Sequence, residues 1–216
     1  MSAAAVAAPR PAQDAPARKR LLDASLTVIR QRGYAATTID DLCATAGVTK
    51  GSFFHHFHSK EDFAIAAAAH FASCADAIFA NAPYRRHADP LDRLLGYVDF
   101  RIGMLRGDLF GFTCLPGTMV QEAYATHPAI RDACGKHIAD HAAMVARDVA
   151  QARKRYAPRA RWSAESLGMH TQAVIQGSFI LAKAQDSPAA AIASLEHLRR
   201  YLELLFESRP SKENRR

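Results

Sequence analysis

The residues best suited to chemistry on a polyanion follow one another in a short segment, residues 37–60 (TTIDDLCATAGVTKGSFFHHFHSK). The side chains that its second half would expose on a helix are Lys50, Gly51, Ser52, His55 and His56. Ammonium, hydroxyl and imidazole groups can donate hydrogen bonds to the base edges that line the major groove of DNA. A helix this short can enter that groove end-on, with its first residues at the bases. The segment is therefore a candidate for reading a DNA sequence directly.

Two short helices must position these side chains, and local signals predict both. Thr38 is followed by an isoleucine and two acidic residues, which is the pattern of a helix N-cap with acids in the first turn. We expect this helix over residues 39–46, ended by Gly47, which can take the positive φ of a tight turn. Thr49 caps the second helix, predicted over residues 50–57. The segment thus predicts a helix-turn-helix.

Helical periodicity continues through almost the whole chain, and no stretch shows the alternation of a β-strand. We therefore predict an all-α protein. Besides a first helix that ends at Gly33, the remaining helices are predicted over residues 60–80, 91–106, 119–124, 128–156, 162–185 and 188–208. A break rich in glycine and aromatic residues is expected at residues 107–116.

Charge and composition favour a nucleic acid as partner. The 216 residues hold 28 Lys and Arg against 21 Asp and Glu, a formal net charge of +7. Within residues 17–60, seven basic residues stand against three acidic ones, which suits a polyanionic partner. An ordinary solvated surface would also account for the charge taken alone. Hydrophobic residues make up 49% of the chain, enough to bury a core.

The compartment is predicted from what the chain lacks. No run approaches the roughly 20 uninterrupted apolar residues that a membrane span needs. Residues 1–17 contain three prolines and no leucine, unlike a signal peptide, and are interpreted as a disordered arm. We expect a cytoplasmic protein without membrane association. In that reducing compartment the free thiols would be Cys43, Cys74, Cys114 and Cys134.

Two other classes of protein compete with a regulated DNA-binding protein. An enzyme would need a catalytic constellation, but the sequence contains no glycine-rich phosphate loop, no nucleophile elbow and no HExxH. We therefore expect no catalytic residues, no cofactor and no metal site; His55, His56 and His58 lack the i, i+4 spacing of a helical metal site. A DNA-binding protein without a ligand, either an architectural factor or an activator, stays open because it would share the same helix-turn-helix.

Residues 37–60, preceded by a Gly33-Tyr34 turn and followed by Glu61, resemble the DNA-binding domain of the TetR family of bacterial repressors. The resemblance is close over about residues 18–65. It implies an N-terminal three-helix helix-turn-helix DNA-binding domain joined to a C-terminal helical domain for ligand binding and dimerisation. The predicted organisation is a disordered arm at 1–17, a helix-turn-helix domain at 18–65, a sensing and dimerisation domain at 66–208 and a frayed tail at 209–216.

The resemblance also implies a role for each candidate DNA-binding residue. Thr38 would bond a phosphate oxygen from a helix N-terminus. Major-groove contacts would come from Thr49, Lys50, Gly51 and Ser52, with Lys50 reading guanine through O6 and N7. The family usually has tyrosine at the position of Phe54, so Phe54 would pack against a sugar or a thymine methyl group instead. Phosphate contacts would come from His56 and Lys60, and His55 completes the exposed face.

The same resemblance implies a homodimer through the last two helices, an inverted-repeat operator in double-stranded DNA, and a small-molecule inducer held among the central helices. Candidate ligand-binding residues are Phe100, Met104, Phe110, Cys114, Met119, His137, His141, His170 and Gln176. Core packing alone would account for most of the aromatic and methionine positions. Cys114 lies in the Gly- and Pro-bounded break, and we hypothesise that its thiol senses an electrophile or oxidant. The alternative is a half-buried packing cysteine.

Overall fold

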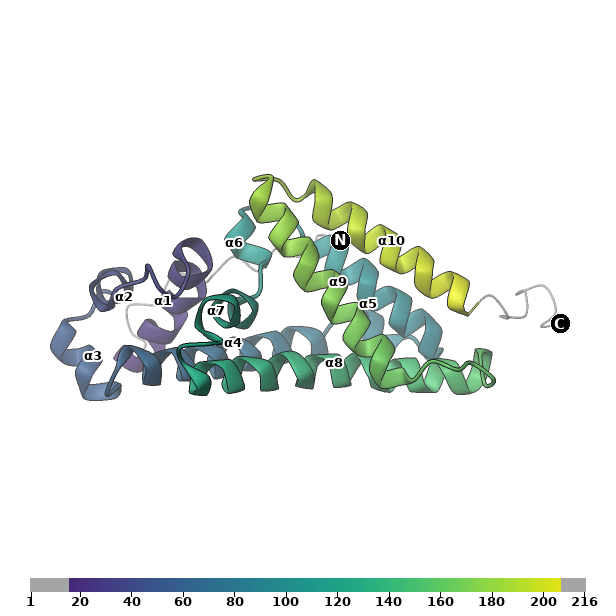
Figure 1. The fold of residues 1–216 in the computed structure, drawn as a ribbon, viewed down its shortest axis with the longest axis horizontal. Coiled ribbons are helices and arrows are strands. Elements are labelled where there is room, and N and C mark those ends of the chain that lie inside the picture. Colours follow the sequence, from purple (N-terminus) through teal and green to yellow (C-terminus); the bar gives the residue numbers. More distant parts are fainter. Residues whose placement is uncertain (1–15, 207–216) are drawn as a thin grey trace. The chain divides into compact units, whose positions relative to one another are not determined.

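The computed structural model describes residues 16–206, and its regular elements are all helices (Figure 1). No strand occurs within residues 16–206, so the predicted all-α fold is confirmed. Residues 1–15 of the predicted arm and the predicted tail at 209–216 lie outside the described residues. The domain boundaries expected near residues 17, 65 and 208 stay predictions.

The described residues form two compact units, 16–80 with 106–138 and 81–105 with 139–206. Elements of the first unit are α1 (Ala17–Arg32), α2 (Ile39–Ala46), α3 (Lys50–His56), α4 (Lys60–Ala80), α6 (Leu109–Phe112), α7 (Leu115–Ala123) and the start of α8 (Pro128–Tyr156). The second unit holds η1 (Pro83–Arg86), α5 (Pro90–Met104), the rest of α8, α9 (Ala164–Ala184) and α10 (Ala189–Leu205).

The core of the first unit is built around three phenylalanine rings. The rings of Phe53 from α3, Phe57 after α3 and Phe63 from α4 have centroids 5.0 to 5.5 Å apart. Helices from much later in the sequence complete the same core. Their contribution is Leu115, Met119 and Ala123 from α7, with Ile130 and Cys134 from α8. The helix-turn-helix therefore shares one core with residues 109–138 and is not an isolated module.

Helix α4 is long and apolar enough to cross a membrane by length and composition alone, with a mean hydropathy of 1.6 in its most apolar stretch. Its apolar face is used inside the first unit, where Phe63, Ala64 and Ala67 are almost fully buried. His70 on the same helix lies 2.8 Å from the buried carboxylate of Asp23 in α1. Because a core helix passes the same test, α4 is weak evidence for a membrane span.

The second unit is a bundle in which α9 packs closely on α8 and alongside α10 (Figure 1). Gly168 of α9 marks a close approach to α8. A Cβ at this position would lie 2.7 Å from the carbonyl oxygen of Ala142 and 3.0 Å from the Cβ of Ala146. The absence of a side chain thus lets the two helix backbones meet, as expected for small residues at a helix crossing.

The predicted helices agree with the structure at both ends for α2, α4 and α8. The break expected at residues 107–116 is only partly right, because it contains α6 and the first two residues of α7. Pro116 lies in the first turn of α7, where proline is well tolerated because its missing N–H would have no helical partner. Cys114, the N-cap of α7, accepts a hydrogen bond at Sγ from the amide of Gly117.

Candidate functional site

Reciprocal hydrogen bonds between Thr38 and Asp41 fix the start of α2. The amide of Asp41 donates to the Thr38 hydroxyl at 3.1 Å, and the amide of Thr38 donates to the Asp41 carboxylate at 2.9 Å, forming a capping box. The Thr38 hydroxyl also donates to that carboxylate and lowers the pKa of Asp41. This hydroxyl already serves the cap, and its phosphate contact stays a prediction.

The turn between α2 and α3 depends on Gly47, as predicted. Gly47 has φ 62° and ψ 43°, the left-handed conformation that ends many helices. Its amide donates to the carbonyl groups of Cys43 and Ala44. From α1, Arg20 donates to the carbonyl of Gly47 at 3.3 Å, so the turn is also tied to the first helix.

Helix α3 presents one apolar face inward and one polar face to solvent. Phe53 is fully buried, whereas the neighbouring Phe54 is 49% exposed. Thr49 caps the helix by accepting from the amide of Ser52 at 3.1 Å. The structure confirms that Lys50, Gly51 and His55 are exposed, while Ser52 and His56 are half-buried.

Lys50, the predicted guanine reader, forms an ion pair in this structure. Its Nζ lies 3.1 Å from a carboxylate oxygen of Asp40 in α2. Both side chains are largely exposed, and exposed ion pairs contribute about 0 to 1 kcal/mol. Lys50 can therefore exchange this carboxylate for a phosphate or a base edge at little cost.

Lys60, the last of the predicted DNA-binding residues, contacts the turn between α1 and α2. Its Nζ donates to the carbonyl of Ala35 at 3.2 Å and lies 4.5 Å from the centroid of the Tyr34 ring. Partial burial lowers the pKa of Lys60, and the nearby carboxylate of Glu122 opposes this effect. The phosphate contact assigned to Lys60 stays a prediction.

The predicted ligand-binding residues are distributed over both units. The first unit holds Phe110, Cys114, Met119 and His137; the second holds Phe100, Met104, His141, His170 and Gln176. Met119 is fully buried in the core of the first unit. His170 is exposed, and its ring packs edge-on against Tyr201 of α10. Ligand binding by any of these residues stays a prediction.

A polar cluster does occur inside the second unit, around His141. The hydroxyl of Tyr97 lies 3.0 Å from Nε2 of His141, and the amide of Gln172 donates to that hydroxyl at 3.4 Å. Burial lowers the pKa of His141 from 6.5 to about 3, and the charges of Arg101 and Arg85 add to this shift. The imidazole is therefore neutral at physiological pH.

Tyr84 brings an unsatisfied group to the same region. Its ring is 3% exposed and lies 5.8 Å from both Tyr97 and Phe100. Its hydroxyl is buried without a hydrogen-bond partner among the described residues. A buried hydroxyl that lacks a partner costs stability and is rare in folded proteins. Tyr84 and Tyr97 were not predicted, because their spacing in the sequence does not separate them from ordinary core residues. Gln172 had a signal, a polar side chain in an apolar helix.

The surroundings of Cys114 combine a helix N-terminus with a buried cation. The guanidinium of Arg30 in α1 is 4% exposed and donates to the carbonyl groups of Gly111 and Thr113, each at 3.2 Å. Burial lowers the pKa of Arg30 to about 10, and Cys114 partly opposes this shift. The Cys114 thiol thus lies at the start of α7, near a buried cation.

The second unit leaves an apolar face exposed on its last two helices. The side chains that form it are Met169, Ile180 and Leu181 of α9, with Tyr201 and Leu204 of α10. Each is between 43% and 57% exposed despite its size. Clustered large apolar side chains on a surface mark sites of association more often than isolated ones do.

A capped helix-turn-helix on one unit and an all-helical second unit define a helix-turn-helix regulatory protein. The chain belongs to the TetR family: residues 21–68 match the bacterial regulatory proteins of the tetR family, and residues 90–198 match the tetracyclin repressor-like C-terminal domain. The family assignment made from residues 37–60 is confirmed.

Individual relatives agree with this assignment. The HTH-type transcriptional repressor KstR2 of Mycolicibacterium smegmatis is 45% identical over 51 residues, which are 24% of this chain and 25% of KstR2. The chain thus spans about a quarter of the length of the curated relatives it matches. The regulatory protein TetR from Rhodobacter sphaeroides has a similar structure, with a TM-score of 0.75 and 25% identity over 88% of this chain and 98% of that one. The reduced form of NemR from Escherichia coli is similar too, with a TM-score of 0.72 and 22% identity. The match covers 86% of this chain and 96% of that one.

Proposed function

We propose that this protein is a sequence-specific DNA-binding transcriptional regulator that acts in the cytoplasm as a repressor. The observation that carries the proposal is helix α3, capped by Thr49, with Lys50 and His55 exposed beside the left-handed turn at Gly47. This is the arrangement with which a recognition helix enters the major groove. KstR2, which matches over about 50 residues, is named a transcriptional repressor, and this supports repression as the mode of action.

The regulator would bind an inverted repeat as a homodimer. The exposed apolar face of α9 and α10 supports this, because a two-fold pair of such faces would bury the five large side chains against each other. A two-fold dimer presents two recognition helices to two half-sites about one helical turn apart, or a multiple of it.

A small molecule would release the protein from DNA, and the polar cluster around His141 is the proposed place for it. Tyr97, His141 and Gln172 are hydrogen-bonded inside an apolar bundle, and Tyr84 offers a hydroxyl that lacks a partner within residues 16–206. A few polar groups among aromatic side chains are typical of small-molecule sites. Arg101 and Arg85 place positive potential there, which suits an inducer carrying an anionic or strongly accepting oxygen.

Selection from genomic DNA tests the proposed function directly. The purified full-length protein is incubated with sheared genomic DNA of its host at physiological salt, and the retained fragments are sequenced. We expect a small set of fragments that share an inverted repeat. Retention of fragments without a shared sequence would overturn the specific regulator and indicate binding driven by charge alone.

Replacing Lys50 with alanine is expected to weaken binding to the selected duplex by about 10- to 100-fold, since a good base contact contributes roughly 1 to 3 kcal/mol of discrimination. Binding to a scrambled duplex should change much less, because phosphate contacts dominate there. Titration of both duplexes by fluorescence anisotropy measures the two effects. Lys136→Ala removes the same charge from an exposed position on α8 and serves as the control. An equal loss on both duplexes for Lys50→Ala would mean that Lys50 reads no base.

The thiol of Cys114 is proposed as a second sensing site, where covalent modification releases the protein from DNA. N-ethylmaleimide is the probe: the thiolate sulfur forms a bond to carbon, the maleimide double bond becomes single, and water supplies the proton. We expect the reagent to lower the operator affinity of the wild type several-fold and to leave the operator affinity of Cys114→Ser unchanged. Cys74→Ser, which removes the other half-buried thiol, is the matched control. Release of both variants by the reagent would exclude Cys114 as the sensor.

A further inference from the structure

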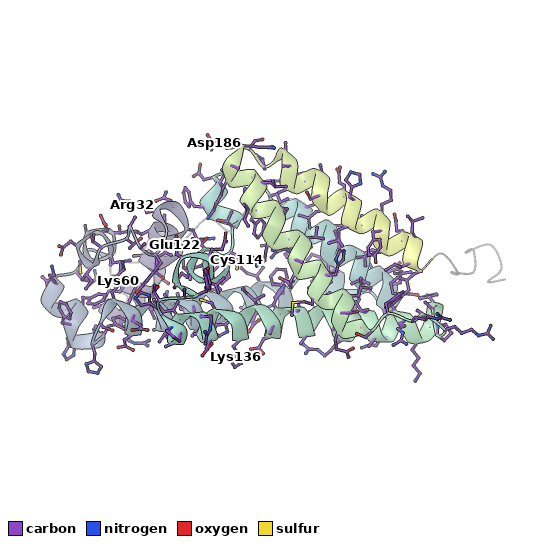
Figure 2. The ribbon with its side chains drawn as sticks, in the orientation of Figure 1. Arg32, Lys60, Cys114, Glu122, Lys136 and Asp186 are labelled. Atoms are coloured by element: carbon purple, nitrogen blue, oxygen red, sulfur yellow. The ribbon has the colours of Figure 1, made fainter. Side chains whose placement is uncertain are left out.

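Glu122, near the end of α7, reaches the turn that joins α1 to α2 (Figure 2). Its Oε2 accepts a hydrogen bond from the amide of Ala35 at 2.7 Å. The two residues are 87 positions apart in the sequence. A carboxylate that accepts from a backbone amide makes a charge-assisted bond, stronger than one between neutral groups. Helix α7 is thus fastened to the polypeptide just before the helix-turn-helix begins.

Gly33 shows that the turn is shaped around this carboxylate. A Cβ at Gly33 would lie 2.3 Å from Oε1 of Glu122, closer than the two atoms could approach. Gly33 also has a backbone φ of 85°, which residues other than glycine rarely adopt. A side chain at Gly33 would therefore have to displace the carboxylate of Glu122 from its place beside the turn.

Ala35 is held from both sides. Glu122 of α7 accepts a hydrogen bond from the Ala35 amide, and Lys60 of α4 donates one to the Ala35 carbonyl at 3.2 Å. The charges of Glu122 and Lys60 attract each other, as the effect of Glu122 on the pKa of Lys60 shows. Beside Ala35, the ring of Tyr34 packs edge-on against His127, which follows α7.

The position of Ala35 constrains the place of the first residues of α2. Thr38, the N-cap of α2, lies only three residues further along the chain. Between them, Thr37 is buried, and its hydroxyl donates to the carbonyl of Gly33 at 2.6 Å. This short, doubly fastened connection leaves α2, and through the Gly47 turn α3, little freedom relative to α7.

The other end of α7 is fastened as well. The residues just before it, Gly111 and Thr113, accept hydrogen bonds from the buried guanidinium of Arg30 in α1. A displacement of α7 must therefore break the Glu122–Ala35 bond or carry the α1–α2 turn with it.

We propose that Glu122 is a positioning residue for DNA recognition: by holding Ala35, it keeps the helix-turn-helix in the conformation that reads the operator. This inference rests on the proposed function and adds a route by which a change at α7 alters DNA affinity. Glu122 touches no DNA in this role. Its own negative charge would repel phosphates, so electrostatics and positioning predict opposite results when it is replaced.

The test compares Glu122→Ala with Glu122→Gln on the operator duplex found by genomic selection. Alanine removes the acceptor for the Ala35 amide, whereas glutamine keeps an acceptor oxygen and removes only the charge. We expect Glu122→Ala to bind the operator about tenfold more weakly, in keeping with the loss of one charge-assisted hydrogen bond. Glu122→Gln should stay within about twofold of the wild type. If charge alone mattered, both variants would bind more tightly.

Three further readouts separate positioning from a general loss of structure. Asp132→Ala removes an exposed carboxylate from α8 in the same unit and should leave operator affinity equal to or above the wild type. The slope of log affinity against log salt should be unchanged in Glu122→Ala, because the same phosphates are contacted. Hydrogen exchange at the amide of Ala35 should accelerate in Glu122→Ala and not in Asp132→Ala.

Operator affinity of Glu122→Ala equal to or above the wild type would overturn the inference, as would an equal loss in Glu122→Gln. Failure of the wild type to select any shared sequence is a different result, since it overturns the proposed function itself. Hydrogen exchange at Ala35 then still reports whether Glu122 holds the turn.

Discussion

Ile180→Glu is expected to convert the protein to a monomer and to weaken operator binding by at least about 100-fold. Ile180 is 48% exposed on α9, within the apolar face shared with α10. In a two-fold dimer each copy of the substitution would place a carboxylate in an apolar contact, and burying an unpaired charge costs several kcal/mol. A single helix-turn-helix then reads only one half-site and loses the contribution of the second. Sedimentation velocity and operator titration measure the two losses.

Ala150→Glu provides the matched control, because it adds the same charge to an exposed position on α8 in the same unit. This variant should remain dimeric and bind the operator normally. A dimeric Ile180→Glu protein with normal affinity would contradict the assignment of the dimer interface to α9 and α10. A monomeric protein with normal affinity would contradict the inverted-repeat mode of binding.

The wild-type protein is expected to lose about 2 kcal/mol of folding free energy between pH 7 and pH 5 through His141 alone. The folded-state pKa of His141 is lowered from 6.5 to about 3, so the native protein keeps the imidazole neutral through this range. The unfolded chain takes up a proton below about pH 6.5 and is favoured as pH falls. Stability is therefore fully present above pH 6.5 and decreases from there toward about pH 3. Urea unfolding at pH 7, 6 and 5 measures the dependence.

His141→Gln isolates this contribution, since glutamine stays neutral and can still accept from the hydroxyl of Tyr97. The variant should show a flatter pH dependence, with the difference from the wild type largest at pH 5. His197→Gln, at an exposed position on α10, should follow the wild-type curve. If His141→Gln and the wild type lose stability in parallel, His141 does not titrate as its burial indicates.

The helix-turn-helix could be predicted in detail because its signals are local. Thr38 followed by two acidic residues predicts a capped helix wherever it occurs, and Gly47 predicts a turn of positive φ by its own chemistry. These signals need no knowledge of distant residues. The structure therefore confirms α2 to the residue and places the expected cap and turn at its two ends.

The polar cluster of the second unit could not be predicted to the same extent, because it depends on contacts between residues far apart in the sequence. Tyr97 and Gln172 are hydrogen-bonded across 75 positions, and nothing in the periodicity of either helix indicates the pair. Glu122 looks like an ordinary surface carboxylate until Ala35 is placed beside it. The contact of the exposed His170 with Tyr201 of α10 was likewise not indicated by the sequence, and ligand binding by His170 stays a prediction. These contacts depend on which side of each helix packs against which neighbour, and short-range sequence patterns do not determine that.

The shared core of the first unit sets an order of events during protein synthesis. Residues 16–80 contain all of the helix-turn-helix, but Leu115, Met119 and Ile130 complete the core on which it packs. Helices α2 and α3, of eight and seven residues, are too short to be stable without such packing. A nascent chain of which only the first 80 residues have left the ribosome therefore has an incomplete core. We therefore expect the helix-turn-helix to become fully packed only after α7 and the start of α8 have left the ribosome.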